Sequence, residues 1–313
     1  MRIAAVVIGR NEGARLIACL DALADVSPVI YVDSGSTDGS VAAAQARGAQ
    51  VVSLDMTQPF TAARARNAGL AQVPADVALV QLLDGDCVVQ AGWIAAATAF
   101  LEDHADVAVV CGRRREMYPQ ASVYNALIDT EWDTPVGEAL ACGGDALMRV
   151  EALRAVDGYN PHLIAGEEPE MCVRLRQAGW RIWRLDAEMT AHDAQITRFS
   201  QWWQRSKRAG HAFAEGAALH GAAPERHWVA ETRRALLWGA AGPLLIVLLT
   251  VLFGPIGLFA ALVYPLQMLR LARRGGTAWG VFNVLGKFAE AQGALGYYLG
   301  RLTGRKKALI EYK

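Results

Sequence analysis

An uncharged run from Ala235 to Leu269 constrains this chain more than any other feature of its sequence. As one straight helix at 1.5 Å per residue, these 35 residues would extend about 52 Å, well beyond the roughly 30 Å hydrocarbon core of a bilayer. Gly254-Pro255 lies near the middle of the run, where proline breaks a helix. The sequence therefore predicts a transmembrane helical hairpin at 235–274, with spans of about 236–253 and 256–269. A buried hairpin in a soluble oligomer and a re-entrant insertion are the alternatives.

Basic residues stand at both ends of the run. Arg233 and Arg234 precede it, and Arg270, Arg273 and Arg274 follow it. Positive charge flanking membrane segments favours the cytoplasmic side. Both ends, and with them the N-terminal domain, are therefore predicted to face the cytoplasm at the inner membrane.

Two amphipathic segments flank the predicted hairpin. Residues 200–234 mix tryptophan with basic side chains, which predicts an interface helix and linker or, equally, a helix packed on the domain. Residues 275–313 keep apolar side chains at helical spacing over 281–299 and end in a tail that includes Arg305, Lys306 and Lys307. This pattern predicts a helix on the surface of an anionic leaflet.

Residues 1–199 have the pattern of an α/β domain. Short, apolar, β-rich runs recur at 3–8, 29–32, 51–54, 77–83 and 107–111. Helical patterns lie between them, so strands and helices alternate, which predicts a mostly parallel, Rossmann-like sheet flanked by helices. Ligands of such sheets bind beyond the carboxyl ends of the strands.

Overall composition excludes several classes of protein. The 31 basic and 31 acidic residues balance, so the total charge gives no support to a nucleic-acid partner. The five cysteines are scattered without CxxC spacing, which argues against zinc and against a secreted disulfide framework. A reducing compartment fits this chain.

Two carboxylates follow the apolar run at 77–83. Asp84 and Asp86 are separated by Gly85, which permits a tight turn. Oxygen ligands at a strand end suit Mg²⁺ or Mn²⁺, and such an ion would neutralise a diphosphate leaving group. Acidic pairs in turns are usually only solvated, but the buried strand before this pair favours a metal site.

Further acidic residues stand where chemistry is expected. Asp33 follows the run at 29–32 and can accept hydrogen bonds from a base or ribose, or cap the next helix. Glu167, Glu168 and Glu170 gather at the start of a predicted helix. Their proximity can raise one pKa toward that of a general base, or they can simply complement the positive helix end.

Taken together, these motifs resemble the family 2 glycosyltransferases of the GT-A fold, in a membrane-anchored bacterial form. The resemblance covers about residues 1–204. Its elements are 10–12, the loop at 33–38, 65–69, the Asp84-Gly85-Asp86 motif, 143–145 before 149–153, 157–159, and 166–168 heading 174–179.

The resemblance implies a nucleotide-sugar site and a divalent metal, Mg²⁺ or Mn²⁺. The implied donor-binding residues are Asp33, Arg66, Asp84, Gly143 and Gly144, with Asp33 on the nucleobase. The implied metal ligands are Asp84, Asp86 and His192. Taken alone, a histidine at this position is more often a hydrogen-bonded surface residue.

The resemblance also implies an inverting hexosyl transfer. Glu168 stands where the family commonly has an aspartate base, and Glu167 and Glu170 are its rivals. An acceptor hydroxyl, deprotonated by this base, would attack the anomeric carbon opposite the nucleotide.

The acceptor is predicted to be membrane-associated or lipid-linked. Processive synthases of the family carry a Gln-x-x-Arg-Trp motif, and the corresponding segment, 201–208, lacks it. A single transfer is therefore favoured over a processive synthase subunit. A nucleotidyltransferase would need a glycine-rich basic loop, which 9–13 matches poorly, and a non-catalytic membrane scaffold is the remaining alternative.

Overall fold

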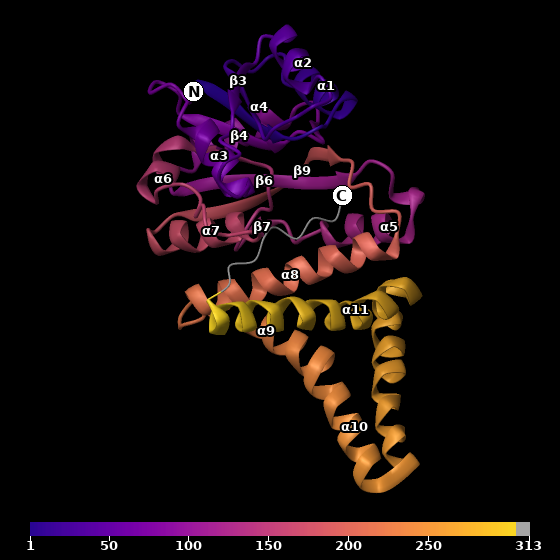
Figure 1. Cartoon of the computed structure of the whole chain (residues 1–313). Helices are drawn as coiled ribbons and strands as arrows, with labels where there is room; N and C mark the ends of the chain where they lie inside the picture. Colours follow the sequence, from indigo (N-terminus) through magenta and orange to yellow (C-terminus); the bar gives the residue numbers. More distant parts are fainter. Residues whose placement is uncertain (305–313) are drawn as a thin grey trace. The chain divides into compact units, whose positions relative to one another are not determined.

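The computed structural model describes residues 1–304, so the predicted basic residues Arg305, Lys306 and Lys307 lie outside the described part. The chain divides into two compact units (Figure 1). Unit 1 contains residues 1–120 and 128–195, and unit 2 contains residues 121–127 and the chain from Ile196 onward.

Unit 1 is built on a nine-stranded sheet. Its strands are β1 Ile3–Gly9, β2 Val29–Asp33, β3 Gln50–Ser53, β4 Leu79–Asp84, β5 Cys87–Val89, β6 Val107–Glu116, β7 Gly137–Glu138, β8 Ala146–Arg149 and β9 Arg181–His192. They follow the order β3-β2-β1-β4-β8-β6-β9-β5, and β7 pairs with β9. The interior of β1 is fully buried, as expected for a central strand covered on both faces. The predicted α/β class is confirmed.

The sheet is mixed rather than uniformly parallel. The pairs β1–β2, β1–β4, β2–β3 and β6–β9 are parallel, as alternating strands and helices predict. In contrast, β8 runs antiparallel to both β4 and β6 and joins the two halves of the sheet. The short strands β5 and β7 also pair antiparallel with β9.

Helices connect and flank these strands. They are α1 Ala14–Asp21, α2 Ser40–Ala46, α3 Ala62–Leu70, α4 Trp93–Asp103, α5 Val123–Glu131, α6 Val150–Ala155 and α7 Glu167–Gln177, with a 3-10 turn at Pro119–Ala121. The first residues of α3 and α7 position side chains of the candidate site. The Thr61 hydroxyl caps α3 by accepting the Arg64 N–H, and α7 begins after Gly166, whose φ of 78° suits glycine.

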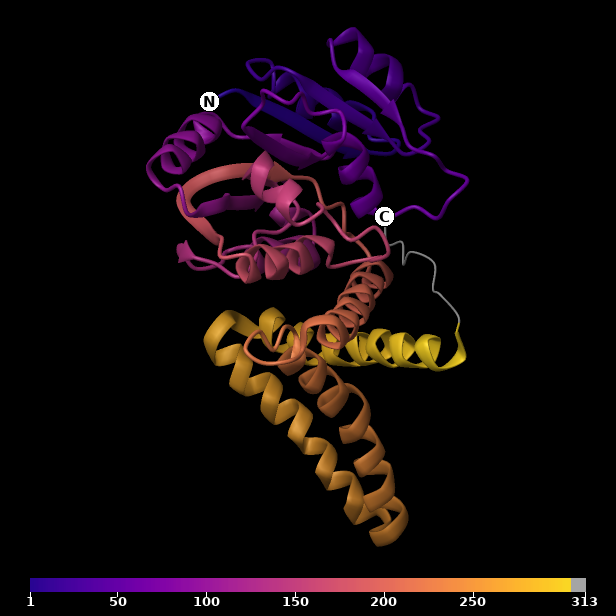
Figure 2. The same cartoon turned by 90° about the vertical axis from the view of Figure 1, so that its left-hand side faces the viewer.

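Unit 2 contains helices joined by turns, with no strand among its described residues. It contains α8 Phe199–His220, α9 Val229–Leu236, a π-helical turn Leu237–Ala241, α10 Gly242–Phe253, a 3-10 segment Gly254–Leu262 and α11 Val263–Thr303. The chain reverses at Gly254 (φ 62°), and α11 bends at Gly276 (φ 85°). Figures 1 and 2 show the resulting hairpin, formed by α10 and the first part of α11.

The second part of α11 packs along α8. Glycines permit this close approach: a Cβ atom at Gly210 would lie 2.0 Å from the Glu290 carbonyl oxygen, and one at Gly293 would lie 1.9 Å from the Lys207 carbonyl oxygen. Trp202 of α8 is buried among aromatic rings that include Phe282 of α11. Trp202 therefore packs α8 against α11 inside unit 2.

The hairpin itself is apolar and exposed. The helical stretch Val229–Thr303 is the one part of the described chain that is long and apolar enough to cross a membrane, and its most apolar portion is almost entirely unburied. Exposed leucine, valine, isoleucine and phenylalanine side chains occur throughout 237–269. Such a continuous apolar surface is typical of contact with lipid.

Candidate active site

Two of the predicted acidic residues flank the carboxyl end of β1. The β1–β2 register places Asp33 opposite Gly9, and the β1–β4 register places Asp84 opposite Ile8. Asp33 and Asp84 therefore lie at the ends of the two strands that pair with β1, one on each side of it. This is the edge of a parallel sheet at which ligands bind.

Asp33 organises the loop that follows β2. Its carboxylate accepts the N–H groups of Gly35 and Ser36, each at 3.0 Å, and the Tyr31 hydroxyl at 3.1 Å. It does not cap α2, because the residue before that helix is Gly39 and Asp38 accepts the Ser40 N–H. Asp33 therefore gives the loop at 33–38 a fixed shape beside the strand ends.

Arg66 joins two of the predicted site carboxylates. From α3 its guanidinium contacts Asp84 Oδ1 at 2.8 Å and Glu167 Oε1 at 2.5 Å. Burial lowers the pKa of Arg66, but the charges of Asp84 and Glu167 outweigh that effect, so the net pKa is raised. The Arg66 side chain is 3% exposed, whereas the Asp84 side chain is 34% exposed and accessible to a ligand.

Gly143 and Gly144 form a close-fitting loop beside this ion-paired group. Gly143 has φ 86°, in the left-handed region. A Cβ atom at Gly144 would lie 2.9 Å from Arg66 Nη2 and 3.3 Å from Asp84 Oδ2. Only glycine at position 144 lets the backbone approach the two charged groups so closely.

Glu168 is buried and accepts hydrogen bonds from the backbone of the same loop. Its Oε1 atom accepts the Cys142 N–H at 2.8 Å and its Oε2 atom accepts the Gly143 N–H at 2.9 Å. The Cys172 thiol donates to Oε1 at 2.9 Å. Burial raises the pKa of Glu168, against the opposing effect of these donors. Glu170, the other rival, pairs with Arg174 at 2.8 Å on the same helix.

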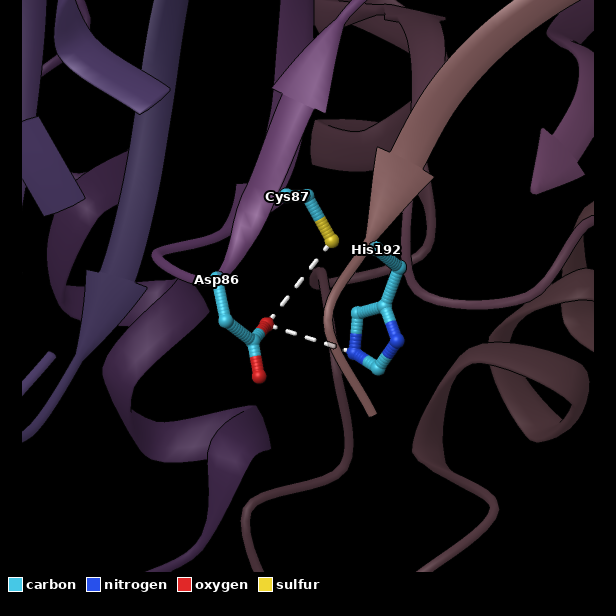
Figure 3. Close-up of side chains that lie close together, drawn as sticks. All are labelled: Asp86, Cys87 and His192. Carbon is cyan, nitrogen blue, oxygen red and sulfur yellow. Dashed lines mark hydrogen bonds and ion pairs between the residues drawn. The ribbon is translucent and has the colours of Figure 1, made fainter. Parts of the chain in front are cut away.

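A second group of site residues surrounds Asp86. Its Oδ1 atom lies 3.3 Å from His192 Nε2, and the Cys87 thiol lies 3.8 Å from the same oxygen (Figure 3). The strand pairing explains this proximity, because Cys87 of β5 is opposite His192 of β9. All three side chains are buried, and together they form a cluster that could hold a metal ion.

The chemistry of these donors fits a divalent cation. Asp86 offers a carboxylate and His192 an imidazole, which are ligand types that Mn²⁺ accepts. The Nδ1 atom of His192 is buried without a hydrogen-bond partner within residues 1–304. Burial and the charges of Asp145 and Asp86 raise the pKa of the Cys87 thiol. A soft sulfur ligand also suits Mg²⁺ and Mn²⁺ less well than a carboxylate does. Asp84 is not in this cluster, since it pairs with Arg66.

The structure adds an ion pair that the sequence did not reveal. Asp145 is fully buried and contacts Arg114 at 3.0 Å and the Thr190 hydroxyl at 2.8 Å. The Arg114 guanidinium lies over the Trp132 ring, which makes a T-shaped contact with His192 at a centroid distance of 4.9 Å. The only hint in the sequence was the glycine pair before Asp145, because Arg114 lies within a strand.

An α/β domain with ordered acidic residues and a cation-competent pair beyond its parallel strand ends has the architecture of a GT-A nucleotide-sugar transferase. Residues 5–155 match the model of glycosyl transferase family 2. These residues therefore form a domain of this family. The predicted family is thereby confirmed.

Comparison with known proteins supports the same fold. The succinoglycan biosynthesis protein ExoA of Rhizobium meliloti is 36% identical over 69 residues, which are 22% of this chain and 21% of ExoA. The aligned part is therefore about a fifth of that relative.

Solved structures align over far more of the chain. The mannosyltransferase PcManGT of Pyrobaculum calidifontis, in complex with GDP-Man and Mn²⁺, has a TM-score of 0.66 at 20% identity, over 94% of this chain and 87% of its own. The S. aureus TarS fragment has a TM-score of 0.56 at 15% identity, over 97% and 92%. Glucosyl-3-phosphoglycerate synthase of Mycobacterium tuberculosis, with Mn²⁺ and UDP, has 0.50 at 20%, over 70% and 80%.

Proposed function

We propose that this protein is an inverting, metal-dependent hexosyltransferase that moves one sugar from a nucleotide-diphosphate donor to a membrane-associated or lipid-linked acceptor. The observation that supports this most directly is the convergence of Arg66, Asp84 and Glu167 at the sheet edge that also carries Asp33. The Mn²⁺, GDP-Man and UDP named with the similar structures support the same donor chemistry.

Within this proposal each donor-binding residue has a distinct task. Asp33 and its loop contact the nucleobase, and Arg66 keeps Asp84 oriented toward the ribose and diphosphate. The loop of Gly143 and Gly144 supplies a close backbone surface next to that carboxylate. A divalent cation held by Asp86 and His192, with Asp84 as a further candidate ligand, would supply positive charge to the diphosphate as it departs.

We further propose Glu167 rather than Glu168 as the general base. Both oxygens of Glu168 already accept backbone N–H groups, and the residue is 2% exposed. Glu167 uses Oε1 for Arg66, no partner is seen for Oε2 within residues 1–304, and its side chain is 13% exposed. A base needs an oxygen that can reach the substrate proton, and Glu167 meets that condition better.

The reaction then involves one base and one displacement. Glu167 accepts the proton of the acceptor hydroxyl, and the hydroxyl oxygen forms a bond to the anomeric carbon. The bond from that carbon to the diphosphate oxygen breaks, and its electron pair leaves with the nucleoside diphosphate. Because the acceptor attacks opposite the leaving group, the anomeric configuration inverts.

A matched pair of variants tests the base. Glu167→Gln keeps a side chain that can bond Arg66 but cannot accept a proton, so kcat should fall about 10²-fold or more. Its Kd for the donor, measured by calorimetry with GDP-mannose and UDP-glucose in Mn²⁺, should change little. Glu168→Gln should retain most of the turnover of its folded fraction. The opposite ranking of the two variants would assign the base to Glu168.

A second pair tests the cation site. Asp86→Asn should remove the carboxylate that the cation needs, so Mn²⁺-dependent donor binding should be lost. Cys87→Ser is the control, because sulfur suits Mn²⁺ less well than a carboxylate does, and this variant should bind Mn²⁺ as the wild type does. Electron paramagnetic resonance of bound Mn²⁺ reports both directly. Equal binding by Asp86→Asn and wild type would refute the assigned ligand.

The membrane part of the proposal rests on unit 2. The hairpin exposes apolar side chains over most of its length, and arginines stand at its base. We propose that it attaches the enzyme to the inner membrane with unit 1 in the cytoplasm, which would bring the active site near a lipid-linked acceptor. Co-flotation of the intact protein with anionic vesicles tests this attachment.

A further inference from the structure

The depth to which the hairpin enters the bilayer follows from the distribution of its polar groups. The name anchor hairpin is used here for residues 237–269. Its two legs and its tip contain no charged residue. Its tip, residues 253–262, is formed by the end of α10 and the 3-10 segment.

All groups suited to a membrane surface stand at one end of the anchor hairpin. Arg234 precedes the first leg and Arg270 follows the second. Trp238 and Tyr264 lie four and six residues from these arginines, and their rings face one another at 5.9 Å. The Tyr264 hydroxyl donates to the Trp238 carbonyl at 2.7 Å. Arginine, tryptophan and tyrosine are the side chains that mark a membrane–water interface.

The tip has no such groups. Its ten residues are phenylalanine, glycine, proline, isoleucine, leucine and alanine only. Ile256 and Phe259 are 71% and 70% exposed. A hairpin that crossed the bilayer would place these side chains in the opposite headgroup layer and water, with no interfacial residue to hold them there.

The backbone near the tip can remain in hydrocarbon. Gly257 packs so closely on the first leg that a Cβ atom there would lie 2.3 Å from the Leu249 carbonyl carbon. The Thr250 hydroxyl donates to the Ile246 carbonyl at 2.8 Å. A 3-10 segment satisfies its own amides, as hydrocarbon requires of any backbone that enters it.

The first leg is only just long enough for a full crossing when it stands upright. From Ala235 to Phe253 there are 19 residues, or about 28 Å of helix, against a hydrocarbon core of about 30 Å and a total of about 40–45 Å with headgroups. The legs converge toward the tip in both views, so they cannot both stand upright in a bilayer at once (Figures 1 and 2). A tilted leg reaches a depth smaller than its own length.

We infer that the anchor hairpin is re-entrant: it enters the bilayer from the side of its arginines, and its tip ends within the hydrocarbon without emerging on the other side. This inference rests on the membrane attachment proposed above and specifies its geometry. The hairpin then anchors the protein from one side of the bilayer only. No part of the hairpin reaches the water on the opposite side.

Cysteine accessibility in vesicles of phosphatidylethanolamine and phosphatidylglycerol tests the inference. Ile256→Cys places a thiol at the tip, and the matched control Thr277→Cys places one at an exposed position beyond the arginines. The wild type, whose cysteines are buried or partly buried, gives the background. A membrane-impermeant maleimide is supplied outside the vesicles or enclosed within them, and SDS-denatured samples show that each thiol can react.

A re-entrant hairpin predicts that Thr277→Cys labels from outside, while labelling of Ile256→Cys is lost from both sides and returns in SDS. Labelling of Ile256→Cys by the enclosed reagent would show a full crossing and overturn the inference. Labelling from outside would overturn it too, because the hairpin would then lie on the surface. Failure of the protein to float with vesicles would instead refute the membrane attachment itself, while sugar transfer would remain a separate question.

Discussion

Arg66 gives the active site its internal order at the scale of single residues. It is the only described cation that the structure pairs with both Asp84 and Glu167. Without it, two carboxylates beside an incoming diphosphate would repel each other and the donor. One guanidinium fork can hold both, which a lysine could not do with the same geometry. The proposed base and the proposed donor ligand are therefore positioned by the same side chain.

Glu168 should make the stability of the wild type depend on pH. Burial raises the pKa of its carboxyl group, although the Cys172 thiol and two backbone amides oppose the shift. A folded-state pKa above the unfolded value means that stability is highest below the unfolded pKa and is lost as pH rises through the folded pKa. Glu168→Gln cannot ionise, so it should gain stability relative to wild type as pH increases from acid to neutral.

Urea unfolding over a pH series measures this difference. Only the slope with pH is diagnostic, because the glutamine also replaces one of the two acceptor oxygens by an NH₂ group, which faces either the Cys142 or the Gly143 amide. That loss shifts the curve at every pH alike. Stability curves that stay parallel between wild type and Glu168→Gln would contradict the assigned cause.

At the scale of elements, the contact between α8 and α11 depends on glycine. A side chain at Gly293 has no room, since its Cβ atom would lie 1.9 Å from a backbone oxygen. Gly293→Ala should therefore push the helices apart and cost about 1–3 kcal/mol, as overpacking typically does. Gly286→Ala is the control, because a Cβ atom there has ordinary contacts at 3.6 Å.

Thermal unfolding in detergent compares the two alanine variants. Gly286→Ala removes a helical glycine at little steric cost, so it should equal or exceed the wild type in stability. Gly293→Ala should unfold at a lower temperature than either. Equal unfolding temperatures for the two variants would show that the helices can separate without loss.

The sequence predicted elements well where the signal was local. The runs at 3–8 and 29–32 became β1 and β2 because a strand buried on both faces is a continuous apolar run. The strand β8 was missed, since its four residues follow a glycine loop and are specified by pairing with β4 and β6, far away in sequence. Its antiparallel direction changes a purely parallel sheet into a mixed one.

The sequence was enough to propose candidate site residues, but it could not show which of them contact one another. Asp86 and His192 meet because β5 and β9 pair, which no local pattern encodes. The same limit explains Asp84, which faces Arg66 from another element rather than the Asp86 cluster. The roles of Glu167, Glu168 and Glu170 also depend on where each side chain points. Successive residues in the first turn of a helix face different neighbours.

At the scale of the whole molecule, catalysis and membrane attachment are assigned to separate units. Unit 1 contains every proposed donor-binding, metal-binding and base residue, and unit 2 contains the anchor hairpin. The chain passes between the units after Gln120, Leu127 and Gln195. A truncation after residue 195 would therefore remove the partners of 121–127, whereas replacement of the hairpin alone keeps both units' cores.

Replacing the anchor hairpin by a flexible Gly/Ser linker should leave donor binding unchanged but reduce access to an acceptor in a membrane. Unit 1 should keep its donor Kd and its turnover with a lipid-linked acceptor dispersed in detergent. With the same acceptor in vesicles, the rate should fall about 10²-fold, since the enzyme loses the raised effective concentration that attachment provides. Inserting the same linker after Leu269 while retaining the hairpin is the matched control and should preserve the vesicle rate. If the hairpin-free protein worked equally well on vesicles, the acceptor would not need to be reached from the membrane surface, and the lipid-linked acceptor would lose its main support.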